Sequence, residues 1–114
     1  MLISALLATA PAGAQQALPA MATVIDPARQ QALIRIVRQD CGSCHGMQLT
    51  GGLGPALTSE ALAGIPVDSV VASIVHGRPG TPMPGWKTLL SVADATWIAR
   101  QLQIGFPQEP KLRP

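Results

Sequence analysis

Apolar residues recur at helical spacing in three segments of this chain. The first predicted helix covers residues 28–39, where Asp26 is placed to cap the N-terminus and Pro27 takes the first position. The residues of this helix divide into two faces. The apolar face consists of Leu33, Ile36 and Val37, and the arginines expected to face solvent are Arg29, Arg35 and Arg38.

Two further helices are predicted nearer the C-terminus. Residues 67–76 have an apolar stripe and end at Gly77, and residues 92–103 begin after Ser91, which forms a capping box with Asp94. A shorter helical turn is expected at residues 59–63. The stripe of the second helix consists of Val70, Val71, Ile74 and Val75, and the third helix directs Trp97, Ile98 and Leu102 inward before Gly105 and Pro107 end it.

The segments between these helices have no periodic pattern. Residues 46–55 are rich in glycine, which indicates tight turns or close approach of the backbone to another group. Residues 78–85 contain three prolines, which exclude helix and central strand and stiffen the loop. Because no segment alternates as a strand does, the predicted fold class is all-α with long loops.

The chain of 114 residues has room for one domain. Residues 1–14 read as a signal peptide cleaved after Ala14, although no Lys or Arg precedes its apolar segment. That segment is shorter than the about 20 residues that a membrane span needs, so no permanent anchor is expected. Residues 15–25 are predicted to be a flexible lead-in, residues 26–106 the folded domain, and residues 107–114 a flexible tail.

Composition and charge reduce the range of possible functions. The formal net charge is +2, without a basic run, which argues against binding of nucleic acid. Only three aromatic residues are present, two Trp and one Phe, so the side chains provide few large groups for a core. A large flat apolar cofactor would fill that core well.

The sequence Cys41-Gly-Ser-Cys44-His45 has the spacing of a c-type haem attachment site. Two thiols add to the haem vinyl groups, and the following histidine reaches the iron as an axial ligand. Three other readings were weighed against it. A disulfide-exchange site normally follows a strand, a zinc site needs four ligands, and a structural disulfide between residues so close in sequence is strained.

Met83 is the predicted second axial ligand of the iron. It lies between Pro82 and Pro84, which fix the backbone so that the thioether is presented rigidly. Met47 is too close to His45 in sequence to reach the opposite haem face. His76 is the rival ligand, and an open iron that binds small molecules is the alternative if neither residue coordinates it.

Four other residues are weaker candidates for the site. The Pro55 carbonyl is placed to accept a hydrogen bond from the His45 ring, which would fix the ring and raise its basicity. Arg78 and Trp86 are candidates for contact with the haem propionates, and Lys87 and Arg78 for the rim of a docking patch. Each of the last three is equally compatible with ordinary surface or core.

From residue 26 to 106 the chain resembles class I cytochromes c: a helix enters the haem motif, a Gly-Pro turn and a methionine loop follow, and a C-terminal helix crosses the first. More narrowly, residues 40–47, 49–58 and 76–84 resemble the cytochrome c55X (NirC) type, which accompanies cytochrome cd1 nitrite reductase. The class resemblance implies that Cys41 and Cys44 bind haem c, that His45 and Met83 ligate its iron, and that Pro55 supports His45.

The narrower resemblance implies a periplasmic carrier of single electrons in denitrification. It would give electrons to cytochrome cd1 nitrite reductase, or accept them from a d1 haem maturation protein. It would not be an enzyme itself. A generic respiratory carrier, a ligand-binding or peroxidase-like cytochrome, and a scaffold with a purely structural haem are the alternatives.

Overall fold

The computed structural model describes residue 13 and residues 24–107. Within these residues the elements are helical, and no strand is present, which confirms the predicted all-α class. The expected signal peptide (with the exception of Gly13), most of the lead-in and the tail beyond Pro107 lie outside the described residues. The elements in chain order are α1 (Pro27–Ile36), the π-helix η1 (Val37–Cys41), α2 (Gly42–His45), α3 (Val67–His76) and α4 (Val92–Ile104).

The first helix begins as predicted but ends later. Asp26 caps α1 by accepting a hydrogen bond of 3.0 Å from the main-chain N–H of Arg29. Helical structure then continues through η1 and α2 to His45, so the predicted end at residue 39 was wrong. Gly42 keeps helical angles, and the first left-handed glycine is Gly46, with φ of 91°. The attachment motif is therefore part of the helix.

The two later helices match the sequence closely. α3 has the predicted bounds and ends at Gly77, where φ is 71°. α4 extends one residue beyond its predicted end, and the capping box between Ser91 and Asp94 is present. Residues 59–63 form a hydrogen-bonded turn and not a helix.

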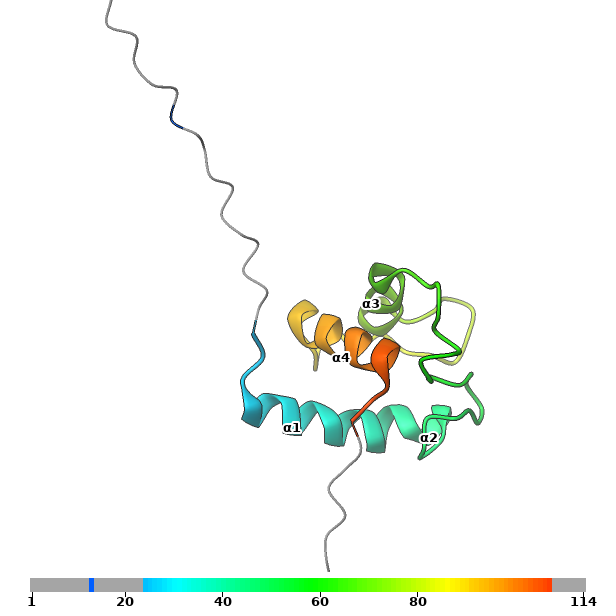
Figure 1. Ribbon diagram of the computed structural model, residues 1–114. Helices are drawn as coiled ribbons and strands as arrows, with labels where there is room; N and C mark the ends of the chain where they lie inside the picture. The colour runs from blue at the N-terminus through cyan, green and yellow to red at the C-terminus, as the bar shows by residue number, and fades with distance from the viewer. Residues whose placement is uncertain (1–12, 14–23, 108–114) are drawn as a thin grey trace, which may run out of the picture.

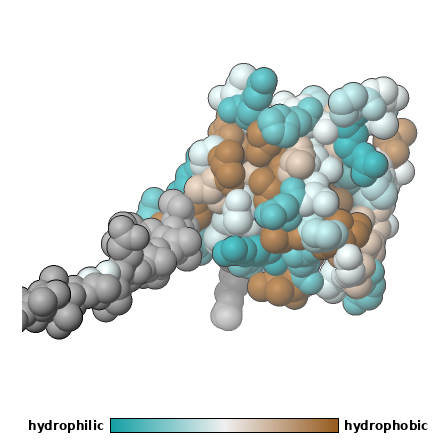
Figure 2. Space-filling view, turned by 90° about the horizontal axis from the view of Figure 1, so that it is seen from above, coloured by the Kyte–Doolittle hydropathy of each residue, from teal (hydrophilic) through white to brown (hydrophobic). Residues whose placement is uncertain are grey.

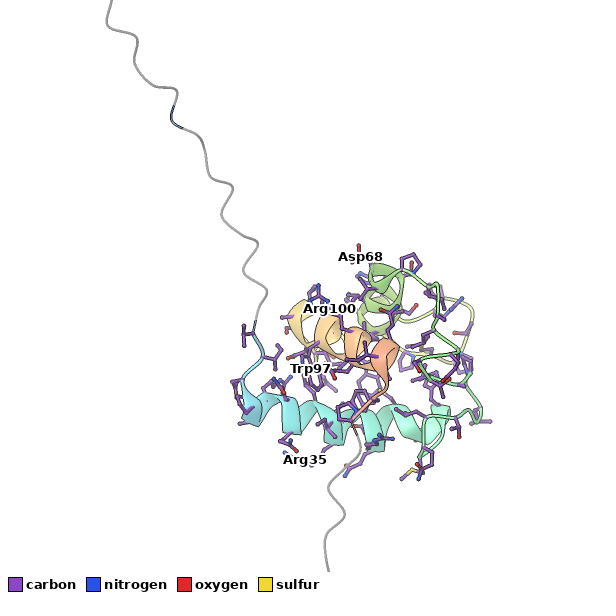
Figure 3. All side chains as sticks on the ribbon, viewed as in Figure 1. Arg35, Asp68, Trp97 and Arg100 are labelled. Carbon is purple, nitrogen blue, oxygen red and sulfur yellow. The ribbon has the colours of Figure 1, made fainter. Side chains whose placement is uncertain are left out.

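α4 packs against α3 and lies above α1 in the view of Figure 1. An ion pair of 2.6 Å between Arg29 and Asp94 joins α1 to α4. Trp97 lies between these helices (Figure 3) and contacts the ring of Phe106 edge to face, with centroids 6.3 Å apart. The most deeply buried large side chains are Leu33, Val37 and Ile98.

Two residues are buried where the sequence predicted exposure. Arg38 was expected on the solvent face, but its side chain is 7% exposed. It follows the buried Ile34 by four residues and Val37 by one, so it lies on the buried face of the helix, and its charge misled the prediction. Its guanidinium donates a hydrogen bond of 2.7 Å to the Pro107 carbonyl and covers the Phe106 ring at 5.4 Å. Ile25, assigned to the lead-in, belongs to the hydrophobic core.

Candidate functional site

The two cysteines of the motif lie one helical turn apart, at the end of η1 and within α2. Cys41 is half-buried and Cys44 is exposed, and they are not joined to each other. Burial, helped by the nearby Asp40 charge, raises the pKa of the Cys41 thiol to about 11. The two thiols thus lie on one continuous helical run, Cys41 in η1 and Cys44 in α2, and neither is used in a disulfide.

His45 is buried, and its ring is fixed by one hydrogen bond. Nδ1 lies 2.7 Å from the Pro55 carbonyl oxygen, so the contact predicted from the sequence is present. Because a carbonyl only accepts, Nδ1 carries the proton, and Nε2 keeps its lone pair. No hydrogen bond reaches Nε2 from any of the residues described by the structure. The ring is thus prepared to bind a metal through Nε2.

The glycine-rich loop after α2 folds back onto the motif. The N–H of Gly51 donates to the His45 carbonyl, and the N–H of Gly54 donates to the Cys44 carbonyl, each at 2.8 Å. Gly54 lies directly against the imidazole, because a Cβ there would come within 2.8 Å of Cε1 and 2.9 Å of Nδ1. The glycine-rich segment predicted a close approach of the backbone in general but did not single out Gly54, whose signal was its position before Pro55.

Met83 is half-buried in the loop that joins α3 to α4, drawn in yellow in Figure 1. Its carbonyl accepts a hydrogen bond of 3.2 Å from the N–H of Arg78, and the N–H of Trp86 donates to the Ile74 carbonyl at 2.9 Å. The loop has neither helix nor strand, as predicted. These bonds hold it against the last turn of α3.

The weaker candidates lie around this methionine loop. Arg78 and Lys87 are exposed, and Trp86 is half-buried against the core. His76 is exposed at the end of α3, where it borders a shallow depression of about 460 Å³ together with Arg78. Figure 2 looks down on the molecule from the α3 side and shows apolar patches separated by polar residues.

The donor set fits a haem better than a bare metal ion. In residues 24–107, no three His, Cys, Asp or Glu side chains come together as a metal site, so zinc has no ligand set there. The residues that are present are two thiols on one helix, an imidazole with Nε2 unpaired, and a thioether on a separate loop. These groups have the chemistry that covalent attachment of a haem and ligation of its iron require.

Comparison with known proteins identifies the family to which this chain belongs. Residues 28–100 match the family model described as cytochrome C oxidase, cbb3-type, subunit III, which defines a cytochrome c domain. Cytochrome c55X of Stutzerimonas stutzeri is 56% identical over 80 residues, which cover 70% of this chain and 71% of that protein. The chain belongs to the cytochrome c55X family of c-type cytochromes.

The solved structures that are similar to this one include a c-type cytochrome and part of a dehydrogenase. A c-type cytochrome NirC has a TM-score of 0.70 at 57% identity and covers 71% of this chain and 95% of its own. The dihydro-heme d1 dehydrogenase NirN in complex with DHE has a TM-score of 0.59 at 35% identity, covering 69% of this chain but 17% of that protein. These likenesses point to the nitrite reductase and d1 haem system.

Family membership implies covalently bound haem c and an electron carrier rather than an enzyme. None of the helices in the described part of the chain combines the length and the hydropathy that crossing a bilayer requires.

Proposed function

We propose that this chain is a periplasmic cytochrome with a single haem that carries single electrons in the nitrite reductase and d1 haem system. Cys41 and Cys44 would hold the haem, and His45, through Nε2, and Met83 would be the ligands of its iron. The observation that supports this most directly is the 2.7 Å bond from His45 Nδ1 to the Pro55 carbonyl, which leaves Nε2 for the metal.

When bound, the haem supplies reversible one-electron chemistry at its iron. The protein keeps both axial ligands in place. The Pro55 carbonyl holds the proton on Nδ1 and so leaves the lone pair of Nε2 for the iron, while the soft thioether of Met83 favours the reduced state. Because main-chain bonds fix both loops, little rearrangement accompanies the change of charge.

Surface residues near the motif suit transient docking. Leu53 is 96% exposed and Met47 is 69% exposed, both in the loop that follows His45. Exposed apolar residues of this kind favour a small contact patch, with Arg78 and Lys87 as positive charges on its rim. Arg78 and Trp86 remain our candidates for contact with the haem propionates.

Two partner roles are compatible with this carrier. It gives electrons to cytochrome cd1 nitrite reductase, or it accepts electrons while d1 haem is completed. The likeness to part of the dihydro-heme d1 dehydrogenase supports the second role, because a domain similar to this chain occurs within a protein named for oxidation of a d1 haem precursor.

Replacing Met83 tests the ligand set. In the haem-loaded protein, Met83→Leu should remove the thioether-to-iron absorption band of the ferric form. It should also lower the reduction potential by part of the roughly 0.8 V range that axial ligands cover. Met47→Leu is the matched control, because this methionine is exposed, and it should leave both properties unchanged. An unchanged Met83→Leu protein would show that the distal ligand is another residue.

Rapid mixing tests the partner. The reduced carrier should be oxidised by cytochrome cd1 nitrite reductase if it is a donor, and the oxidised carrier should be reduced by dihydro-heme d1 dehydrogenase with its substrate if it is an acceptor. Transfer in neither direction would contradict a role in this system. Ready binding of carbon monoxide to the reduced protein would instead favour the alternative with an open iron.

A further inference from the structure

The hydroxyl of Thr81 joins two parts of the methionine loop. Its Oγ1 donates a hydrogen bond of 2.7 Å to the Arg78 carbonyl and accepts one of 3.3 Å from the N–H of Met83. A side chain that donates and accepts at one atom must be a hydroxyl in this position. Thr81 is therefore the link between the start of the loop and its methionine.

This link matters because Met83 has few other ways to be held. Pro82 and Pro84 have no N–H, so the N–H of Met83 is the single main-chain donor of residues 82–84. That N–H bonds to Thr81, and the Met83 carbonyl accepts from the N–H of Arg78 at 3.2 Å. Both polar main-chain groups of Met83 are thus connected to Arg78, one of them through the hydroxyl.

Arg78 is in turn fixed by the end of α3. It follows Gly77, which lies so close to the returning loop that a Cβ there would come within 2.7 Å of the Gly85 nitrogen and the Met83 oxygen. The closed ring formed by Arg78, Thr81 and Met83 therefore has a firm base. Removing the hydroxyl would open one side of this ring and leave the other side intact.

We propose that Thr81 is a positioning residue for the sixth iron ligand. Its hydroxyl fixes the main chain of Met83 so that the thioether resists displacement from the iron. This inference rests on the proposed function, in which Met83 is the distal ligand. Thr81 acts through the main chain of Met83 and is not itself a ligand of the iron in this proposal.

The test compares the binding of imidazole to the ferric iron of haem-loaded variants, since imidazole must displace Met83. Thr81→Val keeps the shape of the side chain and loses the hydroxyl, so imidazole should bind about fivefold more tightly, as expected for loss of one such bond. Thr81→Ser retains the hydroxyl and should restore binding to within about twofold of the original protein.

Thr96 provides a matched control on α4. Its hydroxyl also donates to a main-chain carbonyl, that of Val92 at 2.7 Å, but it belongs to a different element. Thr96→Val should bind imidazole as the unchanged protein does. A purely structural effect of losing a threonine hydroxyl would affect both valine variants.

The outcomes separate this inference from the function on which it rests. A ferric protein with the thioether band, whose Thr81→Val variant binds imidazole unchanged or whose Thr81→Ser variant behaves like the valine, overturns the positioning role alone. If the unchanged ferric protein lacks the thioether band, Met83 is not the ligand, and both proposals fail.

Discussion

The loop after His45 and the loop that contains Met83 both return to the helix that precedes them, but they are held in different ways. The first is held by main-chain bonds from glycine N–H groups to the carbonyls of Cys44 and His45. Gly54 approaches the His45 ring so closely that no side chain fits between loop and ring at this position. The second also has main-chain bonds, but it is stiffened by prolines and uses the side-chain hydroxyl of Thr81 as a further link, in a largely exposed position.

This difference separates stability from ligand retention. Changes in the first loop disturb a buried ring and close main-chain packing, so they should reduce the free energy of unfolding. Changes in the second loop affect an exposed segment with few buried contacts, so they should mainly release the methionine. The following variants test whether the two effects can be obtained independently.

Gly54→Ala should have the largest effect. The new Cβ would lie 2.8 Å from Cε1 of His45, so the ring must move and lose its bond to the Pro55 carbonyl. We expect the free energy of unfolding in denaturant to fall by about 3 kcal/mol. The yield of haem-loaded protein should fall with it.

Gly42→Ala is the control for this variant. Gly42 also belongs to the motif region, but its Cβ would meet its nearest atom, the Val37 oxygen, at 3.6 Å, which is an ordinary contact. Its helical conformation suits alanine, so stability should be unchanged or slightly higher. Equal losses in the two variants would contradict the special role given to Gly54.

Gly77→Ala should produce the second largest effect, and a different one. Its φ of 71° disfavours a side chain, and the Cβ would come within 2.7 Å of the Met83 oxygen. We expect about 2 kcal/mol of lost stability together with loss of the thioether band in the ferric spectrum.

Gly80→Ala separates the effect of backbone strain from the effect of the close contact at the Cβ. It has a similar φ of 79°, but nothing lies within 4 Å of its Cβ position. This variant should lose about 1 kcal/mol through backbone strain and keep the thioether band. If Gly77→Ala keeps the thioether band, the end of α3 does not fix the loop of Met83.

Arg38→Met should have a smaller effect, on the helix that leads to the motif. The variant loses the bond to the Pro107 carbonyl and the contact with the Phe106 ring, which should cost about 1.5 kcal/mol. Arg35→Met changes an exposed arginine of the same helical run, which points away from α4 in Figure 3, and should stay within about 0.5 kcal/mol. The free energies of unfolding of the two variants show whether the contacts of Arg38 stabilise the fold. Equal values would show that Arg38 contributes no more than an exposed arginine.

Arg38 also shows where prediction from the sequence stopped. The helices at residues 67–76 and 92–103 could be predicted because apolar spacing and a terminal glycine agree in both, and a capping box marks the start of the second. The π turn at η1 has no such signal, so the predicted helix end at residue 39 was wrong. The exposure of Arg38 was wrong for another reason: it was assigned by charge, although the residue follows the buried Ile34 by four positions. The wider turn is stabilised by tertiary contacts with the C-terminal segment, which spacing along one helix does not contain.

In the candidate site, too, some features could be predicted from local sequence and others depend on the tertiary fold. The attachment motif and Met83 could be predicted because their chemistry depends on local sequence, and the contact between His45 and Pro55 followed from the need to fix a ligating ring. The roles of Gly54 and Thr81 depend on how loops fold back, which a single sequence does not specify. Binding of iron by His45 and Met83 stays a prediction.

Asp94→Asn should have the smallest effect and should act on both loops together. The ion pair of Asp94 with Arg29 joins α4 to α1, and α1 leads to His45. α4 also packs against α3, which leads to the loop of Met83. The pair therefore supports the loop after His45 and the loop of Met83. The exposed part of the Arg29 side chain weakens this pair through solvent screening, and we expect a loss of about 1 kcal/mol at pH 7. The asparagine still accepts from the Ser91 N–H, so the helix cap is kept.

The pH dependence of stability makes this last test specific. The hydrogen bond from Arg29 holds the pKa of the Asp94 carboxyl below its ordinary value of 3.8, so its stabilisation is present above that value. It is lost as the pH falls through the lowered pKa. Unfolding free energies of the original protein and Asp94→Asn should therefore differ at pH 7 and converge in strong acid. A constant difference across this pH range would show that the ionised pair contributes nothing. Loss of only His45 or only Met83 as an iron ligand during acidification would show that the ion pair of Arg29 with Asp94 does not support both loops.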